Sequence, residues 1–148
     1  MRRVVGALRD PEEAPALAPP PSLSRVEKLV ARARETGLQV DLDIEGELVS
    51  LPAGVDLTAY RLVQEGLTNS IKHAAASRAD VRVRYDGDYV EIEVCDDGRG
   101  GGVDAATNGG GHGLVGMRER VSIYGGELEA GPRAEGGFRL RARLPVAT

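Results

Sequence analysis

Two segments that alternate strictly between apolar and charged residues, 81–85 and 90–94, constrain the fold of this chain most. Successive side chains of a β-strand point to opposite faces, so each segment predicts a half-buried strand. A two-residue turn at Asp86 and Gly87 joins the two strands into a hairpin with these partners: Val83 opposite Val90, and Arg82 opposite Glu91. Apolar side chains then meet on one face and opposite charges meet on the other. The hairpin predicts a sheet with one buried face and one charged face.

The rest of the chain alternates between helical and strand-like periodicity, with glycines and prolines between the segments. The final strand-like segment again alternates, and it turns Arg139, Arg141 and Arg143 away from the apolar face. The remaining predicted elements are a helix from Ser22 or Ser24 to Gly37, a strand over 38–44, a short strand over 47–51, a helix over 55–75, a loop over 97–112, a helix over 114–124, and a hairpin that pairs 128–130 with 138–144. Together they predict an α+β fold, a two-layer α/β sandwich whose mixed, mostly antiparallel sheet is covered on one face by three helices.

Composition limits the kinds of partner that suit the chain. A net charge of −4 and a pI near 5.3 argue against a nucleic-acid surface, because surfaces that bind the phosphate backbone are usually basic. The single cysteine, Cys95, allows no internal disulfide and suits a reducing cytoplasm. The apolar runs are far shorter than a bilayer requires, so we expect that this chain does not itself span a membrane.

The N-terminal part has a composition unlike that of the rest. Residues 11–21 contain five prolines among alanines and predict an extended linker. One interpretation is a hinge between domains, and the other is a tail wrapped on the surface. Residues 1–8 are basic and apolar, as the end of a longer helix would be. We therefore divide the chain into 1–10 as a helix remnant, 11–21 as a Pro-rich linker and 22–148 as a domain.

The predicted helix around residues 64–74 has a polar face and an apolar face. The polar face spans about a third of the helix circumference and contains Glu65, Asn69, Lys72 and His73. The apolar face lies opposite and contains Val63, Leu67, Ile71 and Ala74. An amphipathic helix with a solvated side also explains this pattern. Asn69 departs from it, because Asn is a poor residue for the middle of a helix. Its amide oxygen would suit Mg²⁺, and Lys72, one turn later, would suit a phosphate.

Asp96 places a carboxylate where the alternation of the second strand calls for a core side chain. A buried carboxylate needs hydrogen-bond donors, and the exocyclic amine of adenine is such a donor that guanine does not present at the same position. The alternative interpretation is that the strand has already ended and Asp96 begins a turn. Gly98 and Gly100 follow, and glycines at alternate positions let the backbone approach a flat ligand closely.

A second glycine-rich stretch, 109–113, leads directly into the helix that begins at Leu114. The first N–H groups of that helix can face phosphate oxygens. The stretch is either a flexible connection or a lid that becomes ordered when a nucleotide binds.

The order and spacing of these motifs resemble one known family. Glu65 to His73, then Asp96-x-Gly98-x-Gly100, then Gly111-x-Gly113-Leu114, resemble the catalytic ATP-binding domain of bacterial sensor histidine kinases. That domain belongs to a superfamily with DNA gyrase, the heat-shock chaperone of ninety kilodaltons and the mismatch-repair MutL proteins. The segment from Gly113 to Gly126 is similar to the subfamily that partners LuxR/NarL-type response regulators. The resemblance covers roughly residues 23 to 145 and implies the α/β sandwich of that superfamily.

The resemblance also implies a role for each motif residue. ATP and Mg²⁺ are the implied ligands, with these assignments: Asn69 on Mg²⁺, Glu65 near the metal and its waters, Lys72 and His73 on phosphates, Asp96 on adenine with Gly98 and Gly100 beside the base, and Gly111, His112, Gly113 and Leu114 as the lid end over the triphosphate. Catalysis would then depend on Glu65, Asn69 and Lys72.

One departure from the family pattern matters. Such kinases phosphorylate a histidine on a separate helical dimerisation domain, whereas His73 and His112 are the only histidines here and both lie inside nucleotide motifs. The phosphoacceptor is therefore expected on a dimerisation domain outside this chain, and residues 1–10 are expected to be the remnant of its last helix. The partners implied are that domain and a LuxR/NarL-type response regulator. The location implied is the cytoplasm, and a parent protein anchored in the inner membrane is compatible with it.

The residues leave other functions open. A serine kinase of the anti-sigma-factor type and a non-catalytic ATP sensor would use the same fold. A gyrase-like ATPase would use Glu65 to activate water.

Overall fold

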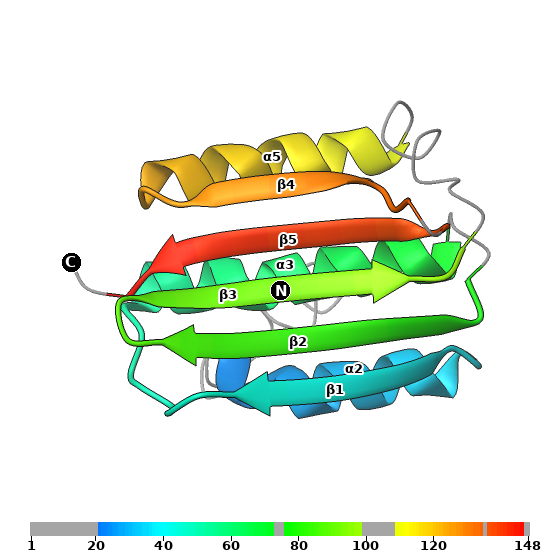
Figure 1. Ribbon diagram of the computed structural model, residues 1–148, viewed down its shortest axis with the longest axis horizontal. Helices are drawn as coiled ribbons and strands as arrows, with labels where there is room; N and C mark the ends of the chain where they lie inside the picture. Colours follow the sequence, from blue (N-terminus) through cyan, green and yellow to red (C-terminus); the bar gives the residue numbers. More distant parts are fainter. Residues whose placement is uncertain (1–20, 73–75, 99–108, 135, 147–148) are drawn as a thin grey trace, which may run out of the picture.

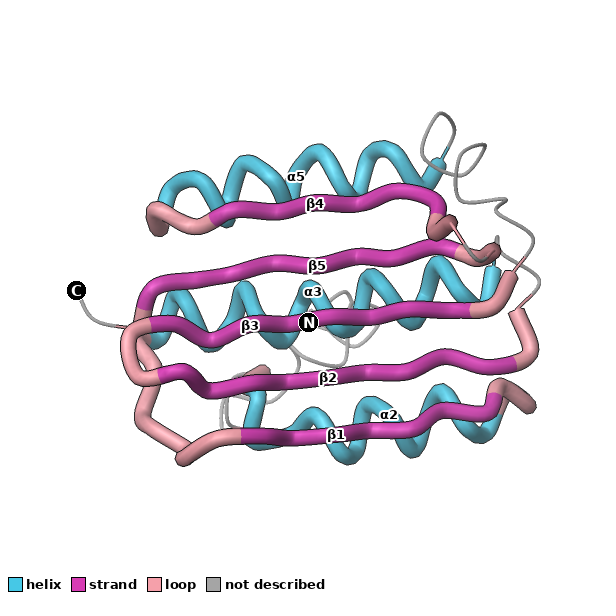
Figure 2. The backbone as a smooth tube through the Cα atoms, in the orientation of Figure 1, coloured by secondary structure: helices cyan, strands magenta, loops and turns pink. Residues whose placement is uncertain are grey.

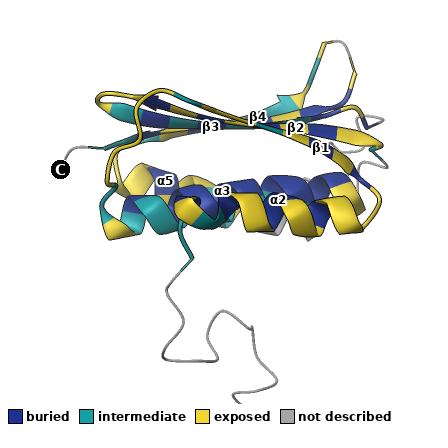
Figure 3. Cartoon of the chain, turned by 90° about the horizontal axis from the view of Figure 1, so that it is seen from below, coloured by how far each residue is buried: buried dark blue, intermediate teal, exposed yellow. Residues whose placement is uncertain are grey.

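The computed structural model describes residues 21–72, 76–98, 109–134 and 136–146, with the backbone alone for 109–113. Within these ranges, one five-stranded sheet in the order β1-β2-β3-β5-β4 lies against the α-helices α2, α3 and α5 (Figure 1). The bounds are η1 (Leu23–Arg25), α2 (Val26–Glu35), β1 (Gln39–Glu45), α3 (Ala53–Lys72), β2 (Arg78–Asp86), β3 (Tyr89–Asp96), α5 (Gly109–Ile123), β4 (Glu127–Pro132) and β5 (Phe138–Pro145). Seen edge-on, the helices cover one face of the sheet and leave the other open (Figure 3). The predicted two-layer α+β sandwich is confirmed.

The β2–β3 hairpin forms as predicted, but its register differs by two residues. Val83 lies opposite Ile92 rather than Val90, and Arg82 lies opposite Glu93 rather than Glu91. The turn falls on Gly87 and Asp88, after β2 has continued through Asp86. Gly87 has φ +61, a left-handed conformation that glycine adopts without strain and that a tight hairpin turn needs.

The remaining strands complete a mixed sheet. The short strand expected over 47–51 is not formed, since Leu48 and Val49 are exposed and pair with none of the described strands. β5 pairs antiparallel with both β3 and β4, and the predicted partners in the last hairpin are found, with Leu128 opposite Ala142 and Ala130 opposite Leu140. β1 pairs with β2 in parallel, in register from Gln39 opposite Arg78. Because parallel neighbours cannot be joined by a tight turn, the chain crosses through α3 between them, as the tube in Figure 2 shows.

The core lies between the sheet and the helices. The apolar residues of β2, β3 and β5 that alternate with charged ones are buried, as are Val63 and Leu67 of α3. Gly66 brings α3 unusually close to β3, since a Cβ at this position would lie 2.8 Å from Cβ of Val94. Glycine is therefore required for this approach, which sets the distance between the C-terminal half of α3 and the end of β3.

Helix α5 begins earlier than the sequence predicts. A loop is expected through residue 112, because consecutive glycines are the poorest helix formers after proline, yet the backbone is helical from Gly109. Packing explains the difference, because Leu114 and Val121 are buried in the core and anchor the helix, and tertiary packing outweighs propensity. The helix ends before Gly125, which has φ +79, as the predicted stop requires. None of the helices in the described residues is both long and apolar enough to cross a bilayer.

The open face of the sheet carries charges arranged by strand. Acidic residues stand on β1, β3 and β4, and arginines predominate between them on β5 and on β2, where Asp80 and Asp86 are the exceptions. Ion pairs cross the strands, for example from Arg82 to Asp43 (3.9 Å) and from Arg141 to Glu91 (2.9 Å). Opposite charges on neighbouring strands stabilise their pairing, so this face needs no cover from another element.

Candidate functional site

The end of β3 and the end of α3 meet at one edge of the sandwich, on the right in Figure 1. Ser70 on α3 donates a hydrogen bond from Oγ to Oδ2 of Asp96 on β3, at 2.8 Å. Both side chains are buried, with Ser70 fully covered and Asp96 exposed by 4%. This contact joins the last part of α3 to the carboxylate predicted on the strand.

The carboxylate of Asp96 is buried at the last residue of β3, as the alternation predicts, and it also accepts from the backbone two residues on, as an aspartate that begins a turn does. Asp96 still pairs with Ala79 of β2 in the register of the sheet. Its Oδ1 accepts from the backbone N–H of Gly98 at 2.9 Å and from that of Phe138 at 3.2 Å. With Ser70 on the other oxygen, the described part of the chain gives the charge three donors, which offset the cost of burying it.

Ser70 was missed as a site residue. The predicted apolar arc of the helix ran through Val63, Leu67 and Ile71, but Ile71 is 39% exposed and the buried arc runs instead through Val63, Gly66, Leu67 and Ser70. A signal was present, because position 70 follows Val63 by seven residues and Gly66 by four, the spacing of one helix face. A serine on that face needs a polar partner, and the carboxylate supplies it.

The side chain of Asp97 accepts hydrogen bonds that hold the backbone next to Asp96 against the start of β2. One of its oxygens accepts from the N–H groups of Ser77 and Arg78, at 2.9 and 3.0 Å, and the other accepts from the Ser77 hydroxyl at 2.8 Å. These hydrogen bonds, first the one from the Ser77 hydroxyl, hold the pKa of Asp97 below its ordinary value. Asp97 therefore joins the chain after β3 to the start of β2 and steadies Asp96.

The turn between β4 and β5 closes over Asp96 from the other side. Arg133 donates from Nη1 to the backbone carbonyl of Asp96 at 3.0 Å. Gly137 has φ +94 and lies so close to the main chain of Asp96 that a Cβ there would collide with it. Asp96 is thus held through its side chain and through its backbone, by three separate segments.

The predicted α3 residues lie on one side of the helix. Asn69 is buried, exposed by 8%, while Glu65 is half-buried and Lys72 is exposed in the last turn. The described residues contain no group of three His, Cys, Asp or Glu side chains that would hold a metal by themselves. Mg²⁺ retains several waters and binds through one or two protein oxygens plus phosphates, so an amide and a carboxylate one helical turn apart fit it.

The structure brings together only part of the predicted set. Gly98 is buried beside Asp96, and Leu114 is buried in the first half of α5. His73 and Gly100 lie outside the described residues. Gly111 and His112, expected in a loop, belong by their backbone to α5, as does Gly113, and the side chain of His112 lies outside the description.

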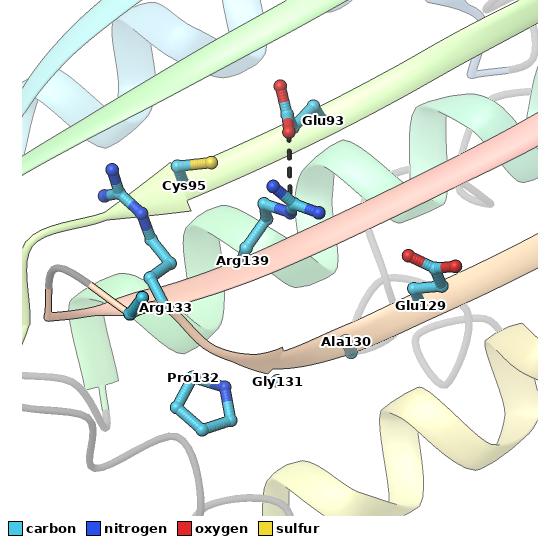
Figure 4. Close-up of a pocket in the computed structure, with 9 residues that line it drawn as sticks. Glu93, Cys95, Glu129, Ala130, Gly131, Pro132, Arg133 and Arg139 are labelled. Carbon is cyan, nitrogen blue, oxygen red and sulfur yellow. Dashed lines mark ion pairs between the residues drawn. The ribbon is translucent and has the colours of Figure 1, made fainter.

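A groove of about 570 Å³ lies on the open face of the sheet, opposite the face that carries the Asp96 side chain (Figure 4). Cys95 and the ion pair of Arg139 with Glu93, 3.6 Å apart, line it. Burial is the main cause that raises the pKa of the Cys95 thiol. Because neighbouring residues of a strand point to opposite faces, the groove and the carboxylate of Asp96 are separated by the sheet.

Comparison with known proteins gives a consistent result. Residues 54–148 match the family model described as histidine kinase-, DNA gyrase B-, and HSP90-like ATPase. The sensor histidine kinase YxjM of Bacillus subtilis (strain 168) is 36% identical over 128 residues, covering 85% of this chain and 30% of that protein. The signal transduction histidine-protein kinase/phosphatase DegS of Brevibacillus brevis is 33% identical over 113 residues, covering 76% of this chain and 29% of that protein.

A solved structure, full-length ShkA in complex with AMPPNP, shares the fold with a TM-score of 0.64 at 24% identity, over 84% of this chain and 29% of that chain. The chain thus spans about 30% of the length of the curated relatives it matches.

Proposed function

The chain belongs to the family of histidine kinase-, DNA gyrase B- and HSP90-like ATPases, and from this premise we propose that it is the ATP-binding catalytic domain of a two-component sensor histidine kinase. In this proposal residues 22–148 form the catalytic domain, residues 11–21 are the linker and residues 1–10 are the remnant of a dimerisation helix. The names of its curated relatives, sensor histidine kinases, support the choice within the family.

One observation carries the nucleotide assignment: the buried carboxylate of Asp96 at the edge of the sandwich. A carboxylate accepts hydrogen bonds and donates none, so it suits the 6-amino group of adenine and repels the 6-oxo group of guanine. The three donors found among the described residues leave one of its roughly four acceptor positions for such a ligand. Gly98 supplies one of these donors from its backbone, beside the proposed position of the base.

The α3 residues and the start of α5 would contact the rest of the nucleotide. We assign Mg²⁺ to Asn69 and Glu65, the phosphates to Lys72 and His73, the base to Asp96, Gly98 and Gly100, and the lid over the triphosphate to Gly111, His112, Gly113 and Leu114. Mg²⁺ bound there would neutralise charge on the phosphate oxygens. Asn69 is buried on α3 and is the residue before Ser70, so its side chain has less freedom to lose when a ligand arrives than an exposed one would.

The proposed reaction is transfer of the γ-phosphoryl group of ATP to a histidine of a dimerisation domain outside this chain. A response regulator of the LuxR/NarL type then receives the group on an aspartate. This chain would contribute mainly positioning and charge neutralisation, with Lys72 holding the phosphate oxygens and Glu65 close to the metal and its waters. The proposed location is the cytoplasm, where ATP is available, whether or not the parent protein is anchored in the inner membrane.

The proposal is tested by binding first. ATP with magnesium, titrated into the chain by calorimetry, should bind, and Asp96→Asn should weaken binding at least tenfold because the amide turns one acceptor into a donor. Asn69→Asp should disturb the binding of nucleotide with metal. Asp80→Asn is the matched control, since it removes the same charge from an exposed position on the open face. Equal affinity of the Asp96 variant and the wild type would contradict the adenine assignment.

Phosphotransfer then separates the alternatives. The chain is mixed with its dimerisation fragment and labelled ATP, and acid-labile phosphate on that fragment supports the histidine kinase. Acid-stable phosphate on a serine would indicate the anti-sigma-factor type of kinase. Binding without transfer would indicate a nucleotide sensor, and appreciable hydrolysis by the chain alone would favour an ATPase that uses Glu65 to activate water.

A further inference from the structure

The donors around the Asp96 carboxylate are distributed unequally between its two oxygens. Oδ1 accepts two hydrogen bonds, from the backbone N–H groups of Gly98 and Phe138, at 2.9 and 3.2 Å. Oδ2 accepts one, from Ser70 at 2.8 Å. Each carboxylate oxygen has about two lone-pair sites. Among the described residues, therefore, the donors fill Oδ1 and leave a site on Oδ2.

Ser70 controls the oxygen that keeps this free site. Its Oγ lies 2.8 Å from Oδ2 of Asp96 and 3.0 Å from the backbone carbonyl of Gly66, and it has one hydrogen to donate. The hydrogen bond to the charged acceptor is the stronger of the two. Ser70 has no exposed surface, so solvent does not reach the hydroxyl to compete for Oδ2.

We propose that Ser70 is a positioning residue for purine recognition: it fixes Oδ2 of Asp96, and this oxygen, rather than Oδ1, accepts from the 6-amino group of the base. The inference rests on the proposed function and adds a determinant of specificity to it. Ser70 does not need to touch the ligand, because it acts through the orientation of the carboxylate.

The test compares two ligands on two proteins. Ser70→Ala in the full 148-residue chain removes the hydroxyl, and calorimetry measures its affinity for ATP and for purine riboside triphosphate, which lacks the 6-amino group. We expect ATP to bind the variant about tenfold more weakly than it binds the wild type, the usual size for one hydrogen bond involving a charge. The ligand without the amino group should lose less than about threefold, because it makes no bond to Oδ2.

The control variant is Thr58→Val. Thr58 is also a buried hydroxyl on α3, exposed by 2%. It lies about 18 Å from Ser70 along the helix axis, at 1.5 Å per residue. The Thr58→Val substitution should leave the affinities for ATP and for purine riboside triphosphate unchanged. Thermal unfolding without nucleotide shows whether each variant is folded at the assay temperature. If Ser70→Ala is unfolded there, Ser70→Cys, a weaker donor of similar size, is measured in its place.

Each outcome decides a different question. A selective loss for ATP supports the positioning role. Unchanged ATP affinity, or an equal loss for both ligands, overturns it and leaves the proposed function standing. If the wild-type chain does not bind ATP at all, the proposed function itself fails.

Discussion

Gly66 is the residue on which the distance between α3 and β3 depends, and Gly66→Ala tests that dependence. A Cβ at position 66 would lie 2.8, 2.9 and 3.0 Å from Cβ, Cγ2 and Cγ1 of Val94. Carbon atoms in contact normally lie about 3.5–4.0 Å apart, so the helix or the strand must move by roughly half an ångström or more. Overpacking of this kind costs about 1–3 kcal/mol. Alanine also has a higher helix propensity than glycine, which stabilises the helix by about 1 kcal/mol. We expect a net loss of about 1 kcal/mol.

The assay is urea unfolding followed by far-ultraviolet circular dichroism, since the chain contains no tryptophan. Gly116→Ala is the matched control: Gly116 lies inside α5 and a Cβ there meets nothing within 4 Å. That variant should gain about 1 kcal/mol, so the two identical substitutions should differ by about 1–3 kcal/mol. The slope of the unfolding free energy with urea should not change.

A double substitution locates the cause. Val94→Ala removes two of the three atoms that the new Cβ approaches, so Gly66→Ala should be less costly in that background. The reasoning is refuted if Gly66→Ala stabilises the chain as much as Gly116→Ala does. It is also refuted if its cost is the same with valine and with alanine at position 94.

Three further predictions follow from the electrostatics of the described residues. The pKa of Asp97 lies below its ordinary value of 3.8, so the contribution of its carboxylate to folding stability is present above pH 3.8 and is lost as pH falls through the lowered pKa. The stability difference between wild type and Asp97→Asn, measured by urea unfolding, should therefore shrink as pH is lowered below 3.8. Arg141→Gln should cost less than about 1 kcal/mol, because its bond to Glu91 is largely solvated, and the cost should fall further in 1 M salt, where roughly 3 Å of screening length remains. Because its pKa is raised, Cys95 should react with an aromatic disulfide at pH 8 more slowly in the folded chain than in urea, as followed by the absorbance of the released thiolate.

The faces of the sheet could be predicted from the sequence, whereas the register could not. Alternation assigns each side chain to a face, and the observed register differs from the predicted one by two residues, an even number that leaves every face unchanged. The position of the turn depends on which residue adopts positive φ. Gly87 occupies the first position of the turn rather than the second, and the alternation on either side is compatible with both placements.

The candidate site was predictable where a residue breaks its own pattern. Asp96 interrupts an apolar series, and that interruption indicated burial. Ser70 was missed because serine on a helix is common and only the partner across the interface, 26 positions away in sequence, gives it meaning. The start of α5 was missed because local propensity favours a loop at glycines, while the helix depends on the packing of residues farther along, such as Val121.

The arrangement of charge by strand has a consequence for contacts between copies of the chain. The two edge strands, β1 and β4, both present carboxylates on the open face: Asp41, Asp43 and Glu45 on one, and Glu127 and Glu129 on the other. Any meeting of two such edges therefore brings like charges side by side, which opposes the growth of a continuous sheet from one molecule to the next.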